Sequence, residues 1–459
     1  MTPLKNLQIL AIILPFFGGC AGLPANKTSL QKVPERFDAS PPPVPEVATS
    51  LRSLFADSGL NGYLARALKA NPDLKISATR LEESGFNTRT SRAALFPSLS
   101  ANGGGFRSQS NSSGQGFDAG TFDAQRYSAS LDVQWELDVW GRIRAGITAA
   151  SQDHLAAEAD YRSALQSISA QTAQAYFQLI GATRRVDLAQ RRQASFEATL
   201  KRVDRRLDLG SGHYGDVSLA KTDVETAKAR LAELTDLRNK ASRLLGALTG
   251  GYPDRSQTAV SWPSLNRRVA AGIPSSLLRK RPDIDAAYQR IRAADARVKI
   301  AHASLFPSFS LTGSSGRQSS GLSDLANSDF NVWSVAGNLT APLFNSGAGR
   351  AELGAANARA KTALAQYHAT VITALREVED ALGSEGFLAS RETALVNALA
   401  AAKNAESRVL RNYESGLVEI LTLLDTQRRS FDTEEALISV QELRYQNRVT
   451  LALALGKAY

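Results

Sequence analysis

Residues 93–100 read "AALFPSLS" and residues 303–310 read "ASLFPSFS", so nearly the same eight residues occur twice, 210 positions apart. In each copy a proline disfavours helical conformation at the phenylalanine before it, which predicts that a helix ends at Pro97 and again at Pro307. The residues after each proline alternate between apolar and polar, and a period of two predicts a strand. Each copy therefore marks a place where a helix is followed by a strand.

A second alternating segment follows each copy, after a stretch rich in Gly, Ser and Asn. We therefore predict four strands, at about 98–107, 126–138, 307–316 and 332–344. In the second of them one face is apolar, with Tyr127, Ala129, Leu131, Val133, Trp135 and Leu137, and the other is polar, with Ser128, Ser130, Asp132, Gln134, Glu136 and Asp138. Strands of about ten residues suit a tilted crossing of a bilayer. A half-buried hairpin in a soluble sandwich gives the same pattern.

The agreement between the two halves continues beyond the strands. Each second strand leads into a long helix through a Gly and an Arg, in "WGRIRAG" (140–146) and in "NSGAGRAE" (345–352). A Gly-centred turn then interrupts each helical pattern, at about 209–216 and at about 412–418. This order of elements, found twice, predicts an internally duplicated chain.

The helices that return from these turns carry a seven-residue repeat of apolar side chains. The repeat comprises Val217, Val224 and Leu231 in the first half, and Leu417, Leu424, Phe431, Ile438, Tyr445 and Ala452 in the second. Sustained heptads predict helices packed side by side as coiled coils, each about 50 Å long at about 1.5 Å per residue. We assign the first repeat to residues 59–250, a linker to 251–273 and the second repeat to 274–459.

The first twenty residues, "MTPLKNLQILAIILPFFGGC", have the basic, apolar and small-residue order of an export signal. Cys20 is the only cysteine and follows two glycines, as in a bacterial lipobox, so we predict a lipoprotein signal peptide at 1–19 and lipid modification at Cys20. A plain signal peptide with an incidental cysteine is the alternative. Residues 20–58, with "PPPVPEV", are predicted to be a lipid-anchored, proline-rich tether.

No run of eighteen apolar residues follows residue 20, so a membrane crossing by the mature chain would have to use strands. Four strands cannot close a barrel, because about eight is the smallest number that does. We therefore expect an α+β membrane protein with four transmembrane strands per chain, in which two, three or four copies join to close the barrel.

Residues 273–316, "IPSSLLRKRPDIDAAYQRIRAADARVKIAHASLFPSFSLTGSSG", resemble the outer-membrane factor family, the TolC-like, NodT-type lipoproteins of efflux systems. The resemblance extends over about 55–455. It implies a homotrimer whose twelve-stranded β-barrel in the outer membrane continues into an α-helical barrel in the periplasm. It also implies a periplasmic adaptor and an inner-membrane transporter of the resistance-nodulation-division type as partners. The expected function is a passive exit duct for small molecules such as drugs or other toxic compounds.

The segment "GLVEILTLLDTQRR" (416–429) contains the predicted gate of that duct. Leu421, Asp425 and Arg428 are spaced by four and three residues, so they share one helix face. In the family, the matching motif narrows the periplasmic end of the duct, where rings of apolar and charged side chains gate by dewetting and by charge. Aligning Gly212 with Gly416 places Lys221 opposite Asp425. We therefore predict that Asp425 pairs with Arg428 or Lys221 in the closed state; an ordinary surface ion pair is the alternative.

The turns themselves, at Gly212 and at Gly416 with Leu417, resemble the sites at which the family's adaptor docks. A glycine at such a turn requires no function beyond a positive φ.

Other classes of function lack a motif in this sequence. The formal charge of +10 is spread among acidic residues, without a basic block, so we expect no nucleic acid as partner. The four histidines, His154, His213, His302 and His368, lack metal-binding spacing, and no nucleophile or phosphate-loop motif occurs. We expect no enzyme, no cofactor and no metal. A duct for type I protein secretion, and a lipid-anchored helical scaffold without a pore, are the alternatives.

Overall fold

The computed structural model describes Phe37, residues 47–48, 50–111, 121–259, 261–265 and 268–269, residue 274 and residues 280–458. The predicted signal peptide and Cys20 lie outside the described residues. The first half contains β1 (Val47–Ala48), α1 (Leu51–Phe55), α2 (Ser58–Ala70), α3 (Pro72–Ala93), β2 (Ser98–Asn111), β3 (Thr121–Leu137), α4 (Arg142–Asp208) and α5 (Tyr214–Leu248). The second contains β4 (Arg268–Val269), α7 (Pro282–Ala303), β5 (Ser308–Ser319), the short 3₁₀ turns η1 (Ser323–Ala326) and η2 (Ser328–Phe330), β6 (Asn331–Thr340), α8 (Ala348–Glu414) and α9 (Ile420–Ala454).

The helices repeat with identical lengths. Both α3 and α7 have 22 residues, α4 and α8 have 67, and α5 and α9 have 35. The long helices of the second half begin 206 positions after those of the first, whereas α7 begins 210 positions after α3. The difference of four residues is therefore taken up between α3 and α4, in the strand hairpins.

Glycines in the left-handed region end the four long helices by one shared hydrogen-bonding pattern. Gly210, Gly250, Gly416 and Gly456 have φ between +69° and +76°. In each case the glycine N–H donates to the carbonyl three residues before it, as Gly416 does to Tyr413. The N–H of the next residue donates to the carbonyl five residues before it, as Leu417 does to Asn412. Only glycine adopts this conformation without strain, so the sequence fixes where each long helix stops.

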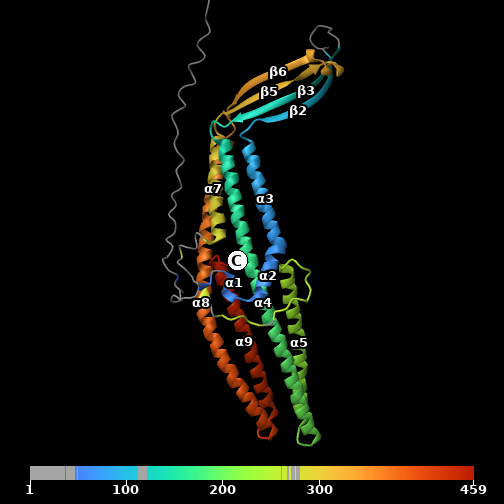
Figure 1. Ribbon diagram of the computed structural model, residues 1–459, viewed down its shortest axis with the longest axis vertical. Helices are drawn as coiled ribbons and strands as arrows, with labels where there is room; N and C mark the ends of the chain where they lie inside the picture. Colours follow the sequence, from blue (N-terminus) through green and yellow to red (C-terminus); the bar gives the residue numbers. More distant parts are fainter. Residues whose placement is uncertain are drawn as a thin grey trace, which may run out of the picture. The chain divides into compact units, whose positions relative to one another are not determined.

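The four long strands form one antiparallel sheet in the order β2-β3-β5-β6, which leaves β2 and β6 as its edges. The register pairs Leu99 with Val133, Val133 with Gly313, and Gly313 with Val335, so apolar residues lie opposite one another on one face. Polar residues share the other face, where Ser100 is paired with Asp132. The strands lie within a few residues of the predicted bounds, and the sheet continues from the ends of α3, α4, α7 and α8 (Figure 1).

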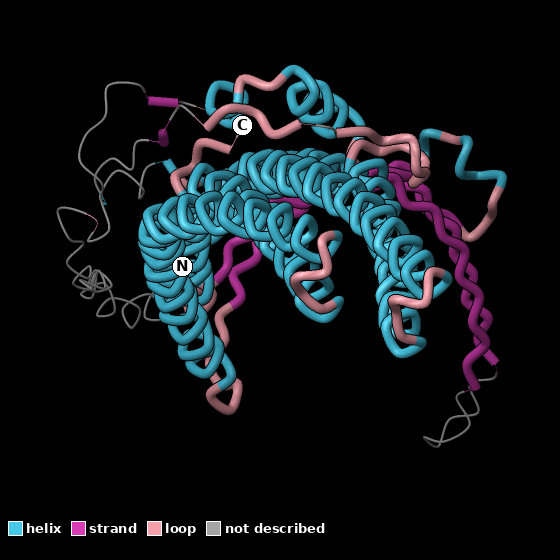
Figure 2. Tube along the Cα trace, turned by 90° about the horizontal axis from the view of Figure 1, so that it is seen from below, coloured by secondary structure: helices cyan, strands magenta, loops and turns pink. Residues whose placement is uncertain are grey.

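The helices of Glu35–Tyr459 lie side by side in a curved layer, in which α3 contacts α4, α4 contacts α7, and α7 contacts α8 (Figure 2). At the end of α4 and α8 away from the sheet, α5 and α9 turn back along them as antiparallel partners (Figure 1). In the described part of the chain no helix is apolar over enough residues to cross a membrane.

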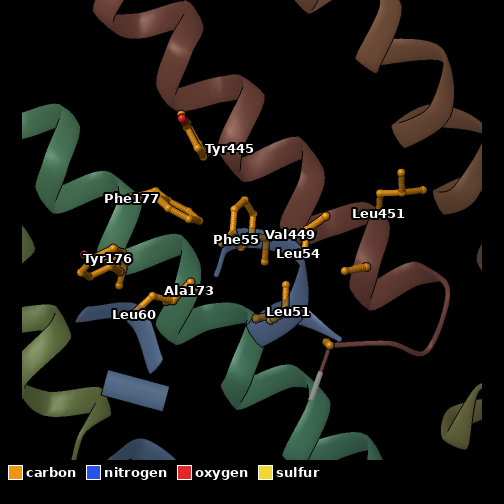
Figure 3. Packing of buried hydrophobic residues seen from close by; sticks show 14 of the residues in the cluster. Leu51, Leu54, Phe55, Leu60, Ala173, Tyr176, Phe177, Tyr445, Val449 and Leu451 are labelled. Atoms are coloured by element: carbon orange, nitrogen blue, oxygen red, sulfur yellow. The ribbon is translucent and has the colours of Figure 1, made fainter. Parts of the chain in front are cut away.

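The main core lies where α1 and α2 meet the middle of α4 and the end of α9. Phe55, Phe177 and Tyr445 pack ring against ring, with centroids 4.7 to 6.1 Å apart (Figure 3). Trp262, from the predicted linker, stacks on Tyr445 at 4.7 Å, and the Tyr445 hydroxyl bonds to the Pro263 carbonyl. The linker is thus part of the core.

The predicted tether at 20–58 is wrong at its C-terminal end. Phe37 is 3% exposed and belongs to the main core. The strand Val47–Ala48 pairs in parallel with Arg268–Val269, and α1 is capped by Ser50 and buries Leu51. Proline content alone suggested an unstructured segment. A short apolar stretch such as "SLRSLF" becomes ordered because its apolar side chains are buried in the main core.

Candidate functional site

The predicted gate residues lie in the first three turns of α9, beside the turn that joins it to α8. Leu421 is 55% exposed and Asp425 is exposed, whereas Leu423 and Leu424 are buried. The buried pair packs in a small core with Phe196, Val203, Ala220, Val224, Ala227, Tyr413 and Ile420. This core draws on α4, α5, α8 and α9, so it holds the two helix hairpins together near their tips and leaves Leu421 and Asp425 at the surface.

An ion pair between α9 and α5 joins the hairpins next to that core. The Arg428 guanidinium donates to both oxygens of Asp223, from Nη2 at 2.7 and 2.8 Å and from Nε at 3.0 Å. Asp223 is 6% exposed, while the Arg428 side chain is 42% exposed. A two-point contact fixes both the distance and the relative rotation of the helices, and it is stronger than a single hydrogen bond.

The predicted partners of Asp425 are wrong. Its carboxylate pairs with Arg429 at 3.1 Å, one turn further along α9, and Arg428 is taken by Asp223. Lys221 is exposed, and no carboxylate among the described residues pairs with it. The alignment behind the prediction is out of register by two residues, because helix lengths match Gly416 to Gly210 and therefore Lys221 to Gln427.

Gln427 forms a second polar contact between the hairpins. Its amide nitrogen donates to Thr199 Oγ1 at 3.1 Å and to Ser195 Oγ at 3.2 Å, both on α4. Gln427 and Thr199 are almost completely buried, at 2% and 0% exposed. A buried amide with satisfied hydrogen bonds specifies one register of packing, because a slip along the helix would leave it unpaired.

Arginines of α4 meet acidic residues of α9 further from the tip. Arg192 pairs with Asp432 at 2.9 Å and Arg191 with Glu434 at 2.6 Å, and Lys403 of α8 also reaches Glu434 at 2.8 Å. Burial acts to raise the pKa of Glu434, but the hydrogen bonds from Arg191 and Lys403 outweigh it and lower the pKa below its ordinary value. Glu434 thus links three helices as a carboxylate.

Acid should loosen this three-helix contact. A folded-state pKa that is lowered contributes stability above the unfolded pKa, about 4.3, and this contribution is lost as the pH falls through the folded value. Thermal unfolding of the parent and of Glu434→Gln, followed by circular dichroism, should differ by about 1 kcal/mol in unfolding free energy at pH 6. The difference should shrink steadily as the pH falls below about 4. A difference that stays constant between pH 6 and the lowest pH at which the protein remains folded would contradict the ionic origin of the contact.

At the tips, Gly416 has a φ of +76° and Leu417 is 74% exposed. Arg206 of α4 donates to the Tyr413 carbonyl at 3.1 Å and lies over the Tyr413 ring at 4.9 Å, so the two tips are in contact. At the first tip the residue with positive φ is Gly210. Gly212 has a different role: a Cβ there would stand 2.9 Å from the Leu207 backbone nitrogen.

Sequence reasoning missed Asp223 and Gln427. Both stand at or beside the heptad positions of their helices, Asp223 just before Val224 and Gln427 three residues after Leu424. A charged or amide side chain at such a position predicts a contact with a neighbouring helix. That signal was available, but it does not say which helix supplies the partner.

Comparison with known proteins places the chain among efflux proteins. A family model described as "Outer membrane efflux protein" matches residues 63–251 and 273–457. Outer membrane protein OprJ of Pseudomonas aeruginosa is 34% identical over 416 residues, which cover 88% of this chain and 85% of OprJ. Cation efflux system protein CusC of Escherichia coli is 28% identical over 463 residues, 99% of each chain.

Solved structures agree with the sequence comparison. The open state of the MtrE outer membrane channel of Neisseria gonorrhoeae superimposes with a TM-score of 0.81 at 30% identity, covering 93% of this chain and 95% of that one. The predicted mixed α and β fold with a four-stranded sheet and long helices is therefore confirmed. The family model matches two segments, each of which extends by one residue into the predicted linker at 251–273.

Proposed function

The chain belongs to the outer membrane efflux protein family; it is an outer-membrane component of an efflux system and extends into the periplasm. On this premise we propose that three copies form a passive exit duct with a closed periplasmic end. The observation that carries the proposal is the sheet, which has two open edges and faces of opposite polarity. No catalytic step is assigned to the duct.

The open edges support assembly. Backbone groups at the edge strands β2 and β6 have no partner within the sheet, and such groups are costly in lipid. Pairing β6 of one copy with β2 of the next satisfies them, and three copies give a twelve-stranded barrel. The face with Leu99, Leu131, Trp333 and Val335, each 54% to 79% exposed, would contact lipid. The face with Ser100 and Asp132 would line the water-filled interior.

The gate proposal rests on which residues the tip leaves free. The Asp223–Arg428 pair and the Gln427 contact hold α9 against the first hairpin, while Leu421 and Asp425 remain exposed. Around a three-fold axis these two would form an apolar ring and a ring of carboxylates that narrow the duct. Opening requires α9 to move away from α5, so the Asp223–Arg428 pair stabilises the closed state.

We further propose the anchors and partners of the duct. Lipid modification of Cys20, after removal of residues 1–19, would attach the chain to the outer membrane. A periplasmic adaptor would dock at the tips around Gly416 and Leu417 and connect the duct to an inner-membrane transporter of the resistance-nodulation-division type. Relatives carry names of cation, antibiotic and solvent efflux systems. Cargo that differs this widely among similar ducts is chosen by the transporter, so we propose small toxic compounds as a class.

Single-channel recording in planar bilayers tests the duct and the gate together. We expect a small, cation-favouring conductance from the mature protein, and a several-fold larger one from a Leu421→Ala, Asp425→Ala variant, because both rings are removed. Large and equal conductances would retain the duct and reject these gate residues. Folded, inserted protein without conductance would support the scaffold that lacks a pore.

Docking at the second tip is tested by a Gly416→Val variant. A β-branched residue at a φ of +76° is strained, and the space around Gly416 is open enough for the side chain to project outward. Export of a toxic compound from cells should be lost while trimers still form. Gly210→Val is the matched control, because Gly210 has the same turn, a φ of +71° and open surroundings. Equal losses from both variants would attribute the effect to strain alone.

A further inference from the structure

Four exposed basic side chains lie near the helix ends that adjoin the sheet. They are Arg89 and Arg92 near the end of α3, Lys299 near the end of α7 and Arg350 at the start of α8, and we call these four residues the basic collar. All four are exposed, and none is paired with a carboxylate among the described residues. On the assumption that the sheet lies in a bilayer, as proposed above, we propose that the collar binds the headgroups of anionic phospholipids in the membrane leaflet that faces the periplasm.

The collar occurs in both repeats at matching positions. Arg89 and Arg92 precede Phe96 by seven and four residues, and Lys299 and His302 precede Phe306 by the same intervals. The spacing of three residues places the two basic side chains of each pair on one side of the helix, and the phenylalanine follows in the turn after the helix end. Arg350 likewise occupies the position in α8 that Arg144 occupies in α4. A basic residue thus recurs at both crossings between helix and sheet.

Exposed aromatic and aliphatic side chains lie directly above the collar, at the crossings themselves. They are Phe96, Trp140, Phe306, Leu343 and Phe344, between 39% and 95% exposed. Aromatic rings of this kind settle at the boundary between lipid and water. At about 1.5 Å per residue, Arg92 lies about 6 Å and Arg89 about 10 Å from Phe96 along the helix axis. A headgroup layer is about 5–8 Å thick on each side, so a long basic side chain reaches the phosphates.

Arg350 has the least favourable electrostatic surroundings of the four collar residues. It lies in the first turn of α8, where the partial positive charge of the helix N-terminus disfavours a cation. Its counterpart Arg144 is neutralised by Asp138, at 3.0 Å, and Asp138 also accepts from the backbone N–H groups of Ile143 and Arg144. The residue three before the N-cap glycine in the second repeat is Phe344 instead of an aspartate. A phosphate from outside the chain would supply the missing charge.

Several arginines further along the same helices do have partners in the chain. Arg297 pairs with Asp153, Arg290 with Asp160, and Arg359 with Glu352, the carboxylate that follows Arg350 most closely in α8. Arg89 lies over the Phe86 ring at 5.2 Å, a contact that leaves its charge uncompensated. The four collar residues have no such carboxylate among the described residues, and they lie near the helix ends that adjoin the sheet.

Native mass spectrometry of the mature protein tests the proposal. Detergent-purified protein is mixed with equal amounts of phosphatidylglycerol and phosphatidylcholine, and the lipids retained are counted. Each basic side chain near an anionic surface contributes about fivefold in binding. We expect at least tenfold preference for phosphatidylglycerol in the parent, declining with salt. The preference should be nearly lost in an Arg89→Gln, Arg92→Gln, Lys299→Gln, Arg350→Gln variant.

The matched control removes four other exposed cations of α8, by Lys361→Gln, Arg376→Gln, Arg391→Gln and Arg408→Gln. It loses the same net charge, so equal loss of preference in the control would overturn the collar assignment in favour of total charge. A collar variant that keeps the parent's preference would overturn it as well. Displacement of the lipid by millimolar inorganic phosphate would assign the site to free phosphate instead.

Conductance in bilayers of phosphatidylcholine alone separates this inference from the proposed function. If parent and collar variant both conduct there, the duct stands whatever the lipid preference shows. If neither inserts, the proposed function fails and the collar assignment fails with it, whereas a parent that inserts but does not prefer phosphatidylglycerol overturns the collar assignment alone.

Discussion

An Arg428→Ala variant should pass several-fold more current than the parent in planar bilayers. The substitution leaves Asp223, at 6% exposure, without the cation that binds both of its oxygens. Because Arg428 is itself 42% exposed, we expect a cost of about 2 kcal/mol to the closed state, between the values for exposed and buried pairs. That cost corresponds to about thirtyfold in the equilibrium between closed and open tips.

Two further variants decide whether the current reports on this ion pair. Asp223→Ala should have a similar effect, and the double variant should add little to either single one, as expected for two residues that act together. Lys228→Ala removes a cation of α5 that is 47% exposed and pairs with Glu225 of the same helix, and it should change the current little. A folded Arg428→Ala protein that conducts like the parent would falsify the role of the pair in closure.

An Arg281→Met variant should lose more stability than any other single change discussed above. Arg281 is 8% exposed at the start of α7, and its guanidinium reaches Asp283 at 2.7 Å, Glu377 of α8 at 2.7 Å and the Ala454 carbonyl of α9 at 3.0 Å. Methionine fills the space but satisfies none of these groups. We expect a loss of about 3 kcal/mol in unfolding free energy. This value is at the lower end of the range for removing one partner of a buried ion pair, because both carboxylates are partly exposed.

Thermal unfolding of the helices, followed by circular dichroism, measures this loss. Arg290→Met is the matched control, two turns further along α7, where the arginine is 49% exposed and pairs with Asp160 of α4. It should cost less than about 1 kcal/mol. Similar losses from the two variants would show that Arg281 has no special part in joining α7, α8 and α9.

The elements of this fold could be predicted because local signals mark them. The helices α3 and α7 end four residues before Pro97 and Pro307, alternation defines the strands, and glycines at positive φ end the long helices. The tip register could not be settled in the same way, because "GSG" at 210–212 offers two glycines and only the full helix length distinguishes Gly210 from Gly212.

The ion-pair partners at the gate depend on tertiary structure. Asp425 has cations at three and four positions further along its own helix, and Asp223 is 205 positions from Arg428 in sequence. Spacing along one helix predicts only local pairs. The preference of Arg428 for a buried carboxylate on α5 follows from how the two hairpins pack, which no pattern within either helix contains. The burial of Phe37 and α1 escaped prediction for the same reason.

The equal lengths of α4 and α8 place the two tips at the same distance from the sheet. A deletion of one heptad from α4, with the matching heptad of α5, would preserve each coiled coil but raise the first tip about 10 Å above the second. Arg206 would then no longer reach Tyr413, so the contact between the two tips would be lost. Among the described elements, the spacing of the two repeats differs only in the strand hairpins, by four residues, so the equal helix lengths keep the two tips level.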